Sequence, residues 1–265
     1  MIIDRIFQPT SIKEAYQILI SYPDAVIIGG GAWLKFQSPK LPFAIDLSKL
    51  NLNRIQETKT FIEIGAMTTL YDLECHVGIQ ELFRGFLSKA FGQVLGVPFR
   101  NIATIGGSIY GKYAFSDIIT PLLCLDVTLN FYKREPMSLV EFLDHKDKIE
   151  DILLSILIRK DQGSGFFKKV SNTPLDFSIV NIGVTYSHHQ FKIAVGARPG
   201  LAKCPLNALS FLNQSNPNEP GVIEKAAAMA VDELTFGTNH LASDAYRKEV
   251  AKVYIVRGIK EVYSV

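Results

Sequence analysis

The first fifty residues alternate between short apolar runs and one amphipathic stretch. From Ile12 to Ile20, hydrophobic side chains recur at helical spacing, and the pair Ser11 and Glu14 has the spacing of a capping box. Residues 25–28 and 43–47 are apolar runs that are typical of short buried strands. Together with an opening strand, this order predicts a small parallel α/β unit.

The region from residue 56 to residue 160 contains both helical and strand-like patterns of hydrophobic residues. Hydrophobic side chains at helical spacing predict one helix over residues 79–95, which Pro98 would end. Ser116 and Asp117 are residue types that favour a helix N-cap, and they are expected to cap a short apolar helix that runs to Leu125. The strand-like segments of this region are 60–65, 127–133 and 152–156.

The pattern changes after Gly163-Ser164-Gly165, which has the composition of a linker. Three strand-like segments follow in close succession and predict an antiparallel meander, and two helical segments come after them. The strands are expected at 166–170, 179–186 and 191–195, and the helices near 221–232 and 243–262. The sequence therefore predicts one domain over 1–160, with subdomains of about 1–55 and 56–160, and a second over 165–265.

Composition narrows the class of protein. The 265 residues are 48% hydrophobic and carry a net charge of +2, which gives no strong field for nucleic acid or an anionic membrane. No stretch of 18 residues lacks a charge, and the N-terminus lacks a signal-peptide pattern, so we expect a cytoplasmic protein without a membrane span. The three cysteines are far apart and the histidines form no ligand motif, so we assign no metal.

Two glycine clusters are the clearest chemical signal. Gly29-Gly30-Gly31 follows a buried strand directly, and Gly106-Gly107 follows Asn101–Ile105. Without a Cβ, successive backbone N–H groups can point at one anion, so two such turns could bind a diphosphate between them. Each cluster on its own is also typical of a tight turn.

Known phosphate and nucleophile motifs do not fit. The dinucleotide fingerprint G-x-G-x-x-G fails, because Leu34 occupies its third glycine position. A P-loop nearly matches at Gly106, Gly111 and Lys112, but Tyr113 stands where Ser or Thr would bind magnesium. A P-loop-type nucleotide-binding protein is thus a weak alternative. No G-x-S-x-G nucleophile motif occurs, and no residue is assigned a catalytic role.

Several segments together resemble one family. The sequence around the two glycine clusters and the last helix is similar to the FAD-binding, or medium, subunit of the molybdenum hydroxylases, the xanthine dehydrogenase and carbon monoxide dehydrogenase group. Arg100–Ser108 is the most specific of the matching segments. The others are Ile27–Leu34, Asp117, Ile152–Ile156, Phe167–Ser171 with Asp176 in a K-x-x-x-R-x-x-D stretch, and Ala242–Arg247.

The resemblance implies an α+β fold with a PCMH-like, two-subdomain FAD-binding domain, followed by a C-terminal antiparallel sheet with helices. It implies a subunit of a larger oxidoreductase, with partner subunits that carry [2Fe-2S] clusters and molybdopterin. Electrons would pass from the clusters through FAD to NAD+ or another acceptor. The chain itself has no cluster cysteines, which agrees with this division of labour.

The resemblance also implies which residues contact FAD. The first segment would wrap the diphosphate and ribityl chain, and the second would hold the opposite side. Asp117 would bind FAD hydroxyls, Leu154 would lie against the cofactor, and Lys168 would approach the flavin ring or its phosphates. The full expected set is Ala25, Val26, Ile27, Ile28, Gly29, Gly30, Gly31, Ala32, Trp33, Thr104, Ile105, Gly106, Gly107, Ser108, Asp117, Leu154 and Lys168. A Gly107→Val substitution is expected to abolish FAD retention and to spare the fold.

The sequence departs from the family at four places. Gly31 and Ala32 replace a hydroxyl residue and an aspartate, Ser108 replaces an asparagine, and Thr173 stands near the expected arginine. These losses support an alternative in which the chain is a family member with a degraded FAD site that serves as an assembly subunit. The aromatic residues Trp33, Tyr110, Tyr113 and Phe115 are candidates for stacking on flavin or adenine, or for core packing.

Overall fold

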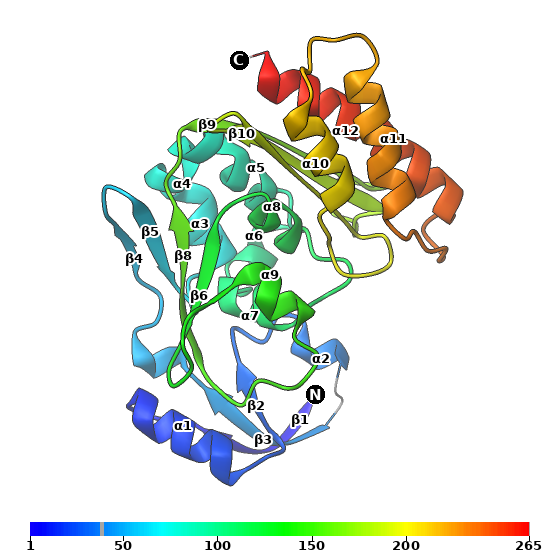
Figure 1. Ribbon diagram of the computed structural model, residues 1–265. Coiled ribbons are helices and arrows are strands. Elements are labelled where there is room, and N and C mark those ends of the chain that lie inside the picture. Colours follow the sequence, from blue (N-terminus) through cyan, green and yellow to red (C-terminus); the bar gives the residue numbers. More distant parts are fainter. Residues whose placement is uncertain (38–39, 265) are drawn as a thin grey trace. The chain divides into compact units, whose positions relative to one another are not determined.

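The computed structural model describes residues 1–37 and 40–264, and the chain divides into two compact units (Figure 1). Unit 1 consists of Met1–Leu73, Val97–Gly111 and Val127–Ile158. Unit 2 consists of Glu74–Gly96, Lys112–Asp126 and Arg159–Val265. The units are thus interleaved along the sequence, and neither of them is one continuous segment.

The first sheet of unit 1 is parallel, as predicted. β1 (Ile2–Phe7), β3 (Lys40–Asp46) and β2 (Ala25–Ile28) lie side by side in that order. α1 (Ile12–Ser21) connects β1 to β2, and the Oγ of Ser11 accepts the N–H of Glu14 at 3.2 Å. The Glu14 carboxylate accepts the N–H of Thr10 and not that of Ser11, so only half of the predicted capping box forms.

The second sheet of unit 1 has five strands in the order β4-β5-β8-β6-β7. The strands are β4 (Ile55–Glu57), β5 (Phe61–Gly65), β6 (Val127–Phe131), β7 (Met137–Ser138) and β8 (Leu153–Arg159), whose last residue already belongs to unit 2. The short helices of unit 1 are α2 (Leu34–Gln37), η1 (Ser48–Leu50), α3 (Leu70–Cys75), α6 (Val97–Arg100), α7 (Ile105–Tyr110) and α9 (Leu139–Asp144). The last two residues of α3 belong to unit 2.

Unit 2 is built on an antiparallel meander. β9 (Gly163–Val170), β10 (Val180–Ser187) and β11 (Gln190–Gly196) pair in the order β11-β10-β9, as the sequence predicts. α10 (Leu206–Gln214) and α12 (Asp244–Tyr263) pack against the sheet, and α11 (Val222–Glu233) packs against these two helices. Their apolar sides share one core with Ile182, Val184 and Ile193 of the sheet. The predicted helices at 221–232 and 243–262 are therefore confirmed, whereas the sequence pattern missed α10.

Two predictions about unit 2 are wrong. Gly163-Ser164-Gly165 is not a linker but the start of β9, and a Cβ on Gly165 would lie only 2.5 Å from Cγ of Phe86. Glycine is required at these positions because aromatic rings pack directly against the backbone, and not because the chain bends there. The single helix over 79–95 is in fact α4 (Val77–Glu81), the 3₁₀ turn η2 (Leu82–Gly85) and α5 (Phe86–Gly92), because Phe83 and Arg84 have positive φ and break the helix.

α5 and α8 (Ile119–Leu123) cover the sheet face opposite to α12. Ile118, and not Ser116 or Asp117, is the N-cap residue of α8, although the Oγ of Ser116 accepts the N–H groups of Ile118 and Ile119 at 3.2 Å. Buried apolar side chains on both faces of the sheet therefore stabilise unit 2.

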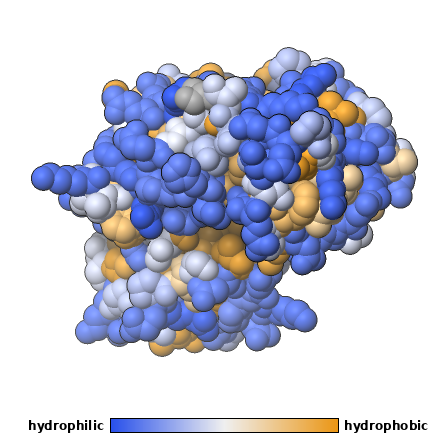
Figure 2. All heavy atoms as spheres, turned by 45° about the horizontal axis from the view of Figure 1, so that its top comes forward, coloured by the Kyte–Doolittle hydropathy of each residue, from blue (hydrophilic) through white to orange (hydrophobic). Residues whose placement is uncertain are grey.

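The surface drawn in Figure 2 is mostly hydrophilic, with hydrophobic residues interspersed. The large hydrophobic side chains that stay exposed come from both units, among them Phe36, Ile102, Leu175 and Leu206. None of the described helices combines the length and the apolar character needed to cross a membrane.

Candidate functional site

The first glycine cluster forms a turn at the carboxyl end of β2. Ala25, Val26, Ile27 and Ile28 make up the strand, which pairs in parallel with β3 and ends as the glycines begin. Gly30 and Gly31 have φ of +78° and +71°, a backbone conformation that other residues adopt only with strain. Within the part of the chain that is described, the N–H groups of Gly30, Gly31 and Ala32 have no hydrogen-bond acceptor. Three successive backbone donors are a chemically suitable set for phosphate oxygens.

The second glycine cluster is not a turn. Thr104 is the N-cap of α7, and Ile105, Gly106, Gly107 and Ser108 form its first residues. Their N–H groups donate within the chain: Ile105 to the carbonyl of Thr68 (3.0 Å), Gly106 to that of Ala66 (2.9 Å), Gly107 to Oγ1 of Thr104 (3.2 Å), and Ser108 to the carbonyl of Thr104 (3.0 Å). These donors are already used, which differs from the expected pair of anion-binding turns. The P-loop alternative also fails, because residues Gly106–Tyr110 form a helix where a P-loop would need a loop with free N–H groups.

The two segments nevertheless meet. The hydroxyl of Thr104 donates to the carbonyl of Gly29 at 2.9 Å, and this hydrogen bond joins residues 75 positions apart. A Cβ on Gly107 would lie 2.9 Å from the oxygen of Gly29, and a Cβ on Gly30 would collide with the carbonyl oxygen of Ile102. The glycines are therefore required by the close packing of the two segments. Gly107→Val would disturb this packing, so it does not test FAD binding separately from the fold.

Two further expected contacts lie elsewhere in unit 1. Trp33 follows the first turn, and its ring centroid lies 4.9 Å from that of Phe36. Leu154 lies in β8, where its carbonyl accepts the N–H of Ala66 at 2.9 Å and its side chain packs on the core around Ile45. Tyr110 also belongs to the core, since its ring packs on Phe142 and its hydroxyl donates to the carbonyl of Ile149.

Asp117 belongs to unit 2 and is buried there. Its Oδ1 accepts hydrogen bonds from Nδ2 of Asn181 at 2.6 Å and from the hydroxyl of Ser178. Burial raises the pKa of Asp117, and the Lys169 ammonium and these hydrogen bonds oppose that rise. The expected role toward FAD hydroxyls stays a prediction, because inside unit 2 this carboxylate already has partners.

Lys169, and not Lys168, is the partner of this carboxylate. The Nζ of Lys169 lies 3.5 Å from Oδ2 of Asp117 and donates to the carbonyl of Gln93 at 3.0 Å. Lys168 lies on the opposite face of β9, with its ammonium over the ring of Tyr254 at 5.3 Å. Sequence reasoning missed Lys169, although the K-x-x-x-R-x-x-D spacing counted back from Asp176 leads to that residue.

The remaining aromatic candidates pack on one another within unit 2. The rings of Tyr113 and Phe115 are stacked with centroids 5.3 Å apart, and Phe115 contacts Phe177 at 4.9 Å. Among the described residues, no group of three or more acidic, cysteine or histidine side chains is arranged to hold a metal ion.

A parallel strand that ends in a glycine turn with three available backbone donors has the chemistry of a phosphate-binding site, which is typical of proteins that bind a nucleotide cofactor. Residues 3–158 match the model of the FAD binding domain in molybdopterin dehydrogenase, and residues 165–262 match the CO dehydrogenase flavoprotein C-terminal domain. The chain therefore belongs to the family of FAD-binding subunits of the molybdenum hydroxylases. It is an oxidoreductase subunit with FAD as its cofactor, and the family resemblance and the α+β fold expected from the sequence are confirmed.

Individual proteins are also similar to this chain. YgfM of Escherichia coli (strain K12) is 28% identical over 233 residues, which cover 86% of each chain. The nicotinate dehydrogenase FAD-subunit of Eubacterium barkeri is 28% identical over 200 residues, 67% of each chain. The structure of quinoline 2-oxidoreductase from Pseudomonas putida 86 has the same fold, with a TM-score of 0.86 at 22% identity over 97% of this chain and 95% of that one.

Proposed function

We propose that this chain binds FAD through the turn at Gly29–Ala32 and passes electrons from the [2Fe-2S] clusters of a partner subunit to NAD+ or another acceptor. The observation that carries the proposal is the set of unpartnered N–H groups at Gly30, Gly31 and Ala32 in the described chain, in a member of a FAD-binding family. FAD supplies the redox chemistry when it is bound, and the protein supplies binding and orientation.

Each segment would have its own part in binding. The N–H groups of Gly30, Gly31 and Ala32 would donate to the diphosphate oxygens, and Thr104 would fix the turn through its hydrogen bond to Gly29. The segment Thr104–Ser108 would hold the cofactor by contact and not through its own N–H groups, since these already have acceptors. Ala25–Ile28, Trp33, Asp117, Leu154 and Lys168 remain proposed contacts of the cofactor.

The partners follow from the family. One relative is named an FAD-subunit and another a medium chain, so this chain would assemble with separate [2Fe-2S] and molybdopterin subunits.

The three thiols, Cys75, Cys124 and Cys204, are free, which fits the reducing conditions of the cytoplasm.

A flavin titration tests the proposal. The purified chain is mixed with excess FAD and desalted, and its visible spectrum is recorded before and after dithionite. We expect a retained flavin spectrum that bleaches on reduction. A colourless protein that also fails to quench FAD fluorescence would contradict the proposal and favour the assembly-subunit alternative, for which the lost side chains at Gly31 and Ala32 are the specific observation.

Gly31→Ala is a sharper probe of the site than Gly107→Val. A Cβ on Gly31 meets only Cγ2 of Ile28, at 3.3 Å, so a small shift of that methyl group accommodates it. We expect FAD affinity to fall at least about tenfold, because a methyl group beside the donors keeps phosphate oxygens at a distance. The strain of an alanine at positive φ costs about 1–2 kcal/mol in addition.

Gly221→Ala is the matched control. Gly221 has a φ of +83°, and a Cβ added there would meet no atom within 4 Å, so the variant reproduces the backbone strain in the other unit. FAD fluorescence quenching gives the affinity, and thermal unfolding gives the stability of each variant. If both variants bind FAD equally well, the turn at Gly31 does not contact the cofactor.

A further inference from the structure

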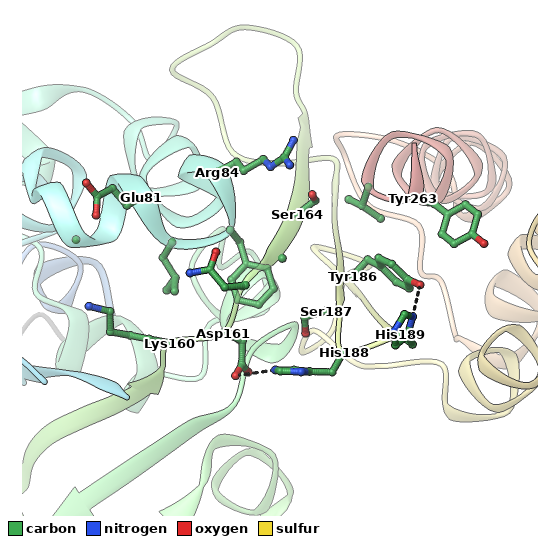
Figure 3. A pocket seen from close by; sticks show the side chains of 16 residues that line it. Glu81, Arg84, Lys160, Asp161, Ser164, Tyr186, Ser187, His188, His189 and Tyr263 are labelled. Carbon is green, nitrogen blue, oxygen red and sulfur yellow. Dashed lines mark hydrogen bonds and ion pairs between the residues drawn. The ribbon is translucent and has the colours of Figure 1, made fainter. Parts of the chain in front are cut away.

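A cavity of about 560 Å³ lies within unit 2, and no step of the proposed electron transfer uses it. Its walls come from the turn at Glu81–Arg84, the segment Lys160–Ser164, the β10–β11 turn at Tyr186–His189 and the end of α12 (Figure 3). Four segments that are distant in sequence therefore converge on one space large enough for a small organic molecule.

Strained backbone is concentrated around this cavity. Of the eight non-glycine residues with positive φ in the described chain, four line it: Phe83, Arg84, His188 and His189. His188 and His189 form a two-residue hairpin turn, a position where Asn-Gly is strongly preferred. Two strained turns at one cavity indicate that these side chains are held in place at the expense of local stability, which is typical of binding sites.

The charges that face the cavity favour an anion. Asp161 is already neutralised, because its Oδ1 lies 3.0 Å from Nε of Arg159 and 3.1 Å from Nε2 of His188. Arg84 forms no ion pair within the part of the chain that is described, and Figure 3 shows its guanidinium extended toward Ser164, with the Glu81 carboxylate pointing away. A guanidinium next to a hydroxyl is a donor set that suits a phosphate group.

The other end of the cavity is aromatic. The rings of Tyr186 and Tyr263 lie edge to face with centroids 5.4 Å apart, and both side chains line the space. Such a wall binds a flat ring by stacking or edge contact. The cavity thus combines a phosphate-type donor set with a surface for a planar group.

We propose that this cavity is a second ligand site, which binds a small molecule that carries a phosphate group and a planar ring. Arg84 and Ser164 bind the phosphate, and Tyr186 and Tyr263 contact the ring. The site is separate in the sequence from the glycine turn, whose residues all belong to unit 1. We expect a ligand here to bind together with FAD and not to replace it.

Isothermal titration of the FAD-saturated full chain with phenyl phosphate tests the proposal. We expect saturable binding that weakens as salt is added, weaker binding of benzoate, and none of phenol. Arg84→Gln should weaken phenyl phosphate binding about tenfold or more, because it removes a charge-assisted hydrogen bond. Lys89→Gln removes the same charge from an exposed position outside the cavity and should leave the affinity unchanged.

A second variant, at the hairpin turn, tests the same cavity if the Arg84→Gln variant is too unstable to be measured. Replacing His188-His189 by Asn-Gly relaxes the hairpin turn and removes one of the two partners of Asp161. We expect a higher melting temperature together with weaker phenyl phosphate binding. No binding to the unaltered chain, displacement of FAD by the probe, equal affinity for benzoate, or full affinity in the Arg84→Gln variant would each overturn the proposal.

Discussion

Replacing Arg247 by leucine is expected to lower the free energy of unfolding by about 3–5 kcal/mol, because several buried acceptors lose their hydrogen bonds at once. The guanidinium of Arg247 is buried and donates to the carbonyls of Ile179, Ala197 and Ala242 and to Oδ1 of Asn239. These acceptors lie at the start of β10, after β11 and before α12. Leucine would leave them without a donor in the interior, where each unpaired group costs about 1–3 kcal/mol.

Chemical denaturation measures this change, and two variants serve as controls. Arg257→Leu makes the same substitution at an exposed position of α12, where the guanidinium only covers the ring of Tyr254, so less than about 1 kcal/mol is expected. Arg247→Lys keeps the charge but not the planar set of donors, and its stability should lie between those of Arg247→Leu and the unaltered chain. A change within about 1 kcal/mol for Arg247→Leu would show that the network is not stabilising.

Lys169→Met has the second large expected effect, a loss of about 3–5 kcal/mol at pH 8, because it leaves the Asp117 carboxylate buried without its cation. Asn181 and Ser178 still donate to this carboxylate, but they do not neutralise it. Asp117→Asn in the same chain should restore most of the stability, since an amide needs no counter-charge. A double-mutant cycle of the four proteins isolates the coupling between the two side chains.

The loss caused by Lys169→Met should depend on pH. Burial already raises the pKa of Asp117 above its value in the unfolded chain, so the stability associated with this group is present at low pH and is lost as pH rises through the folded pKa. Removing Lys169 removes a charge that lowers this pKa, and the pKa rises further. The stability of the variant should therefore approach that of the unaltered chain as pH falls and Asp117 becomes protonated, and a difference that stays constant with pH would contradict this explanation.

The sequence predicted most elements because each has a local cause. The parallel sheet of unit 1 and the meander of unit 2 follow from apolar periodicity, and α1 follows its predicted cap, Ser11, whose hydroxyl accepts the N–H of Glu14 in the structure. The errors arose where a distant contact decides the conformation. Gly163 and Gly165 indicated a linker, but they stay in β9 because Phe83 and Phe86 fill the space beside them.

The segments of the candidate site could be predicted from the sequence, but the hydrogen bonds within the site could be predicted only in part. The glycine pattern and the family resemblance identified both segments that meet at Gly29 and Thr104. Local sequence does not show that Ala66 and Thr68 accept the N–H groups of the second segment, because these acceptors lie about forty positions away. Apolar periodicity also does not show which of the adjacent Lys168 and Lys169 pairs with Asp117, because neighbouring residues on a strand face opposite sides.

The interleaving of the two units sets an order for folding during synthesis. The segments that carry α5 and α8 leave the ribosome well before β9, β10 and β11, although Phe86 and Thr120 pack against Gly165, Gly183 and Gly196 of those strands. These early apolar helices have no sheet to cover until β9, β10 and β11 are made. The nascent chain therefore exposes hydrophobic surface from the synthesis of α5 until β11 is complete, and it would depend on chaperones more than a protein whose domains follow one another in sequence.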